Sequence, residues 1–235
     1  MLLASMMATL IALQAAPSAP NSSPMTESPA MTMARANRSR MKVAPSFRSG
    51  PDPDVPAAAQ AAGEFGKVTI SGIIGVDGHF SEAKVAVSSR STLLDTTALA
   101  IANSTVFDPA KDENGAPLAI SAQMPVEFSN AKTPGKGGGV LRYRCDQFAR
   151  DYDWWFRTWP TGNHDDFYLL VLGFSTIAKA RDRNGALDIN KFASVNRDFE
   201  SRWKSAVEAC RAAPDRLFID VFQPEGKLMR GMADK

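Results

Sequence analysis

The chain has 235 residues, 44% of them hydrophobic and 22% charged, which is enough for one large soluble domain or two small ones. Its 27 basic and 25 acidic residues give a formal net charge of +2, which excludes a strongly basic nucleic-acid-binding protein as the default class. The basic excess is local, in a stretch without acids between Glu27 and Asp52. This stretch contains Arg35, Arg38, Arg40, Lys42 and Arg48. It fits either a solubilising linker or a weak attraction to anionic lipid or envelope polymer.

The N-terminus is apolar from Met1 to Leu13, and small residues follow at Ala15 and Ala16. This pattern predicts a secretory signal peptide over residues 1–16. As a helix the run would reach ~20 Å, short of the ~30 Å hydrocarbon core, so cleavage is favoured over anchoring. No Lys or Arg precedes the run. Either the signal is atypical or the true start lies upstream, and an extension would turn the run into a permanent membrane helix.

Residues 17–62 are rich in Pro, Ala and Ser, with Phe47 as the only aromatic residue. Such a composition buries too little apolar surface to offset chain entropy. We therefore expect a disordered linker here, with a short helix at Ala57–Ala62.

The pattern changes to strand alternation at Gly66, where Val68 and Ile70 alternate with polar residues. Asp77-Gly78 is a strong hairpin signal, because glycine tolerates the positive φ of primed turns. The sequence predicts a first strand from Gly66 to about Val76 and its partner at Phe80–Val87.

A helix is expected to open near Leu93, capped by Asp95 or Thr92. Its apolar stripe consists of Leu94, Ala98, Leu99, Ile101 and Ala102. Phe107-Asp108-Pro109-Ala110 ends it, and Asn114-Gly115 marks a turn. A third strand then begins at Leu118.

The Gly-rich segment 131–139 predicts a flexible connector. Residues 140–235 beyond it predict a mainly helical domain, with helices at Cys145–Trp159, Asp166–Arg181 and Lys191–Cys210. The β-branched and aromatic run Leu217–Phe222 is interpreted as a final strand.

Candidate catalytic and metal-ligating residues are weak. His164-Asp165-Asp166 suits a metal or acid–base set, but a polar loop whose Asp165 or Asp166 caps the next helix is the simpler interpretation. Asp182, Asn184, Asp188 and Asn190 alternate like calcium ligands, yet no Glu closes the loop. His79 lies at a hairpin and is most simply a surface residue. We expect no cofactor, no metal and no catalytic residue set.

The helical region holds four clustered aromatic residues, Tyr152, Trp154, Trp155 and Trp159. Core packing is the first explanation for them and a sugar- or peptide-stacking surface is the second. Cys145 and Cys210 are the only cysteines. In an exported protein they predict one disulfide, and the alternative is a reactive thiol pair.

Residues from about 64 to 128 resemble the C-terminal domain of TonB. The resemblance is carried, in order, by Asp77-Gly78, Ser88-Ser89, Leu94-Asp95 with Ala98, Phe107-Asp108-Pro109-Ala110, Gly115-Ala116-Pro117 and Pro125-Val126-Glu127-Phe128. It implies a three-stranded antiparallel sheet with one helix over residues 63–130. Together with the helical region, this gives an α+β fold class.

The resemblance also implies a periplasmic binding module rather than an enzyme. Its partner would be a protein of the cell envelope, an outer-membrane receptor segment if the chain is a true TonB, bound by strand pairing that couples inner-membrane energy to transport. Membrane contact would come only from an uncleaved N-terminus. The predicted docking edge consists of Leu118, Ile120, Ala122, Met124, Val126 and Phe128. The alternative is a non-transducing envelope assembly protein whose helical domain binds the partner.

Overall fold

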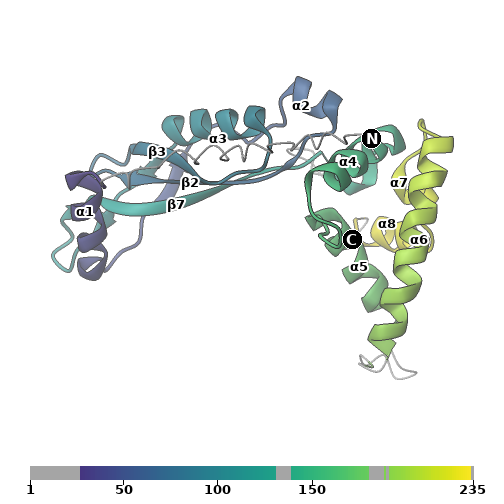
Figure 1. Cartoon of the computed structure of the whole chain (residues 1–235). Coiled ribbons are helices and arrows are strands. Elements are labelled where there is room, and N and C mark those ends of the chain that lie inside the picture. The colour runs from purple at the N-terminus through teal and green to yellow at the C-terminus, as the bar shows by residue number, and fades with distance from the viewer. Residues whose placement is uncertain (1–26, 131–138, 180–187, 189–190, 234–235) are drawn as a thin grey trace, which may run out of the picture.

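The computed structural model describes residues 27–130, 139–179, 188 and 191–233. A sheet unit, which begins with α1 (Pro29–Ala36), and a helical unit, which begins at Val140, lie at opposite ends of the molecule (Figure 1). The predicted signal peptide and most of the Gly-rich connector lie outside the described residues. About half of the described residues are helical and about a quarter are in strands, which confirms the α+β fold class.

The sheet contains three antiparallel strands, β2 (Gly66–Ile74), β3 (Phe80–Val87) and β7 (Ile120–Phe128). Their order is β3-β2-β7. The first two form the predicted hairpin, in which Gly78 has a φ of +82°. β7 pairs with β2 without interruption from Gly66↔Phe128 to Ile74↔Ile120. The central strand is therefore β2, and β7 is an edge strand.

Helix α3 (Thr92–Ser104) covers one face of this sheet (Figure 1). Its Leu94, Ala98 and Ala102 are fully buried, and they belong to the same core cluster as Val68 and Ile70 of β2. The predicted stripe is confirmed, although Leu99 and Ile101 are only partly buried. The predicted cap is wrong, because Ser91 Oγ accepts the N–H of Leu94 at 3.2 Å. Asp95 instead accepts hydrogen bonds from Ser88 and Ser89.

Two small ribbons complete this unit. β1 (Ser46–Ser49) pairs with β4 (Val106–Asp108), and β5 (Ala110–Lys111) pairs with β6 (Pro117–Leu118). Phe47 packs edge-on against Phe107 at 6.5 Å between ring centroids.

The structure corrects the expectation of a disordered linker for residues 27–62. This segment contains α1, η1 (Asn37–Arg40), β1 and α2 (Ala57–Ala62), and of these elements only α2 was expected. The physical reason is tertiary. Met31 and Ala34 of α1 are buried against Ile73 on the sheet face opposite α3, so the sheet supplies the apolar surface that the segment lacks. Ser28 Oγ caps the helix by accepting the N–H of Met31 at 3.0 Å.

The helical unit contains η2 (Val140–Arg142), α4 (Cys145–Thr158), α5 (Asp166–Lys179), α6 (Phe192–Ala212), α7 (Phe218–Val221) and α8 (Glu225–Ala233). The three helices predicted for this unit are present as α4, α5 and α6, and α8 was not predicted. The predicted strand Leu217–Phe222 is wrong. Phe218, Ile219 and Phe222 are all buried, and their i, i+1, i+4 spacing suits one helix face. Leu217 makes only an isolated bridge, to Arg144.

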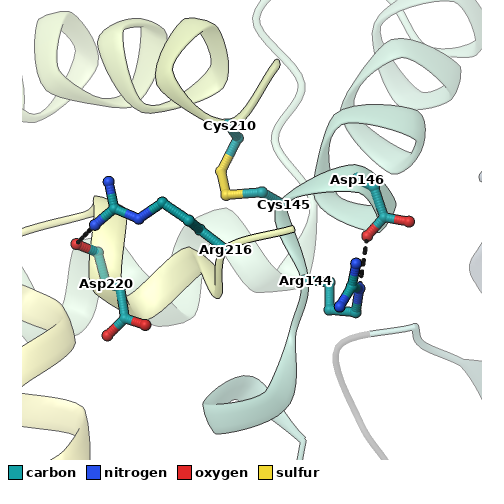
Figure 2. Close-up of a disulfide and its surroundings, with 6 residues drawn as sticks. All are labelled: Arg144, Cys145, Asp146, Cys210, Arg216 and Asp220. Carbon is teal, nitrogen blue, oxygen red and sulfur yellow. Dashed lines mark hydrogen bonds and ion pairs between the residues drawn. A yellow bond between two sulfur atoms is a disulfide. The ribbon is translucent and has the colours of Figure 1, made fainter. Parts of the chain in front are cut away.

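A disulfide joins Cys145 at the start of α4 to Cys210 near the end of α6 (Figure 2). Both cysteines are fully buried. The side chains of Arg144 and Asp146 pair beside the bond at 3.1 Å, and Arg216 donates to the backbone oxygen of Asp220 (Figure 2). The predicted pairing is confirmed.

Among the residues whose structure is described, no helix is both long enough and apolar enough to cross a membrane.

Candidate strand-docking edge

The outer border of β7 has no partner strand in the described part of the chain. In an antiparallel ladder alternate residues point their N–H and C=O groups to opposite sides. The carbonyls of Ala119 and Ser121 face outward, because they accept hydrogen bonds at 2.9 Å from the side chains of Asn37 and Arg38. By alternation, the backbone of Gln123 also faces outward, as does that of Pro125.

The predicted edge residues are the even-numbered ones, which alternate with these outward-facing residues. Of them, Ile120, Val126 and Phe128 are buried, Ala122 and Met124 are partly buried, and Leu118 lies in β6. Their side chains belong to the core under α3, and from Ile120 onward their backbone groups pair with β2. The structure therefore places the predicted strand at an edge, while these six side chains stabilise the module instead of lining its outer border.

The sequence contained one signal for the outward residues. Proline has no N–H, so inside a sheet it is confined to edge strands and to positions that do not donate to the ladder. Pro125 in the middle of β7 therefore indicates an edge strand. It also indicates that the odd-numbered residues are the ones whose backbone groups face outward. Hydrophobic alternation selects the even residues because it detects burial, which is a property of side chains.

One end of the edge is covered. Asn37 and Arg38, which follow α1, occupy the outward carbonyls of Ala119 and Ser121. The covered part ends there, and Gln123 is exposed. The accessible edge therefore begins at about Gln123 and runs toward the helical unit.

The sheet face opposite α3 is polar beyond Ile73, with Lys67, Thr69, Ser71 and Lys84 at least partly exposed. Two hollows flank this face. One of about 600 Å³ lies beside α1 and includes Ser121 and Gln123 of β7. The other, of about 280 Å³, lies at the junction with the helical unit.

Three of the four clustered aromatic residues, Trp154, Trp155 and Trp159, form this junction, whereas Tyr152 packs within the helical unit against Phe148 and Phe156. Phe65, which precedes β2, packs against Trp154 and Trp155 with ring centroids 5.5 and 5.3 Å away. Trp155 stacks on Trp159 at 5.1 Å, and the Arg90 guanidinium lies 4.2 Å from the Trp159 ring centroid. The cluster thus joins the two units, in addition to the packing that the sequence predicted for it.

Gly63 allows a close approach at the same junction. It ends α2 with a φ of +73°, and a Cβ at this position would lie 2.4 Å from the Arg150 carbonyl oxygen. Gln147 Nε2 donates to the Gln60 carbonyl at 3.0 Å. The contact between α2 and α4 is therefore fixed by backbone shape as well as by aromatic packing.

Asp151 of α4 lies beside the junction hollow and is 2% exposed. Its carboxylate accepts hydrogen bonds from Tyr143, Gln147 and Asn130. Burial raises the pKa of Asp151 to about 7, although the three hydrogen bonds act in the opposite direction. Asn130 is the last described residue of the sheet unit, so this carboxylate also links the two units.

The histidine and aspartate candidates have structural roles. Asp165 Oδ1 accepts the N–H of Tyr168 at 2.6 Å, which confirms the predicted helix cap. The His164 ring stacks on Tyr168 at 3.7 Å between centroids, and the His79 backbone bridges to Val106. Within the described ranges, no group of three or more His, Cys, Asp or Glu residues could hold a metal. The calcium-like run lies outside the described residues except for Asp188.

A small sheet with one helical cover and an open edge strand is suited to binding an extended protein segment. Residues 51–129 of the 235, about a third of the chain, match the family described as Gram-negative bacterial TonB protein C-terminal, which confirms the resemblance that the sequence showed. The family is a non-enzymatic interaction domain of envelope-associated proteins, so the chain carries a TonB-like envelope protein-binding unit. No curated protein and no solved structure matches the chain.

Proposed function

We propose that this chain is a periplasmic protein that binds another protein, and that its β7 edge pairs with an extended segment of an outer-membrane receptor. The observation that carries the proposal is the outward backbone of Gln123 on an edge strand. Strand addition at such an edge obtains its affinity from main-chain hydrogen bonds. In a transport role, this pairing would pass inner-membrane energy to the receptor.

Gln123→Pro tests the pairing. A proline at this outward position removes one edge N–H and leaves the β2–β7 ladder intact, as Pro125 already does two residues away. Proline at Ile120 or Ala122 would instead remove ladder hydrogen bonds and destabilise the module. The matched control is Gln123→Ala, which removes the side chain and keeps the N–H.

The full chain is used to capture detergent-solubilised outer-membrane proteins, and receptors are identified by mass spectrometry. We expect Gln123→Pro to reduce receptor capture at least tenfold and Gln123→Ala to retain it. Equal capture by the proline variant would contradict strand pairing. If capture were instead lost on replacing Phe156, which is 64% exposed on α4, the helical unit would be the binding surface.

A further inference from the structure

The hollow beside α1 has a strong charge bias. The charged side chains that line it in the described part of the chain are all basic, namely Arg35, Arg38 and Lys84. Two of these cations come from residues 29–40, outside the segment that matches the family. The charge of this hollow is therefore a property that α1 and η1 add to the module.

Two of these cations, Arg35 and Lys84, remain largely available to a ligand, whereas Arg38 donates to the Ser121 carbonyl. Arg35 is paired with Glu27 at 2.9 Å, but its side chain is 65% exposed, and such surface pairs are weak. No ion pair between described residues involves Lys84, which is exposed on β3. Other basic residues of the same segment are engaged: Arg48 pairs with Asp108, and Arg40 lies 3.7 Å from Asp112.

The hollow adjoins the docking edge. Ser121, Ala122 and Gln123 of β7 line it together with the cations. A guest strand beside β7 directs alternate side chains to opposite faces of the enlarged sheet. Because the accessible edge begins at about Gln123, only the guest residues nearest Gln123 on the α1 side lie beside the hollow. Arg38 already contacts the β7 edge there, at the Ser121 carbonyl, while Lys84 lies farther away on β3.

We infer that the β7 edge selects an extended protein segment that carries acidic side chains on the α1 side at its end nearest Gln123. This inference rests on the proposed strand pairing and specifies its partner. Main-chain hydrogen bonds hold the segment, and the basic hollow sets its register and excludes basic sequences.

The test uses three fluorescent ten-residue peptides of alternating Thr and Val, in which three Thr positions are Glu, Gln or Lys. Binding to the full chain is measured by fluorescence anisotropy at low ionic strength. We expect the Glu peptide to bind about tenfold more tightly than the Gln peptide, and the Lys peptide to bind least. Added salt should narrow the difference.

Arg35→Glu with Lys84→Glu should abolish the preference for the Glu peptide. Arg38 is left unchanged because its guanidinium binds the Ser121 carbonyl. The matched control, Arg157→Glu with Arg197→Glu, makes the same change in net charge at two exposed positions of the helical unit and should keep the preference.

Three outcomes would overturn the inference. Equal binding of the Glu and Gln peptides, both lost in Gln123→Pro, would leave strand pairing standing without charge selection. Binding of the Glu peptide that persists undiminished in Gln123→Pro, and is displaced by dextran sulfate, would show a simple polyanion surface. No binding of any peptide would remove both the inference and the proposed pairing.

Discussion

At the scale of single residues, the docking border depends on backbone direction. Ser121 and Gln123 are polar residues of a strand whose apolar neighbours have the opposite parity, and Pro125 shares their outward position. A hydrophobic pattern cannot identify them. Their role follows from the pairing with β2 and from the side chains of Asn37 and Arg38 on the neighbouring carbonyls.

Asp151 supplies a prediction at this scale. Burial raises its pKa from 3.8 to about 7, so the folded chain holds a proton that the unfolded chain has released. Stability therefore falls as the pH rises from about 4 to about 7. Between pH 5 and pH 8 this group should cost about 2–3 kcal/mol of unfolding free energy. Burial also raises the pKa of Asp165, to about 6, so this group too lowers the stability of the folded chain as the pH rises.

Asp151→Asn mimics the protonated side chain, so its denaturation midpoint should fall less between pH 5 and pH 8 than that of the unmodified chain. Urea unfolding followed by tryptophan fluorescence measures this, because all four tryptophans lie in the helical unit. A variant that is equally pH-sensitive would show that Asp151 is ionised in the folded protein throughout this range.

At the scale of elements, caps and coverings were the hardest features to predict. α3 was expected from its apolar stripe, but three polar residues near its start were all chemically able to cap it. Ser91 is the N-cap of α3, because its Oγ accepts the Leu94 N–H and also donates to Glu64 at 2.5 Å. α1 was not expected at all, since its stability comes from Ile73 of a distant strand.

Ser91→Ala should therefore destabilise α3 by about 1 kcal/mol, the usual contribution of a serine N-cap. Thr92→Ala is the matched control, since Thr92 is exposed at the first helical position and its side chain makes no capping bond. Hydrogen exchange of the α3 amides should accelerate about fivefold in the first variant only. Equal acceleration of hydrogen exchange in the two variants would show that Ser91 is not the residue that caps α3.

At the scale of the whole molecule, two units are joined by a small aromatic and polar junction. Phe65 and Gly63 contact α4 from the sheet side, and Asn130 reaches Asp151. The disulfide joins α4 to α6 within the helical unit (Figure 2). Its effect should therefore be confined to the helical unit.

Replacing both Cys145 and Cys210 by Ser tests this separation. The cysteines are 65 positions apart, and closing such a loop stabilises the folded state by about 4 kcal/mol in the entropic model. We expect the urea midpoint reported by tryptophan fluorescence to fall strongly, while peptide binding at β7 changes less than twofold. Loss of peptide binding in a still-folded variant would show that the two units depend on each other.

The sequence alone determined the sheet, its hairpin, α3 and the three main helices, because alternation, helical spacing and the Asp77-Gly78 turn are local properties of the chain. It also predicted the disulfide, since two cysteines allow only one pair within the chain. The tertiary structure decided that residues 29–49 are ordered, that Leu217–Phe222 is not a strand, and which side of β7 faces outward. Each of these depends on surfaces brought together from distant parts of the chain, which no local pattern records.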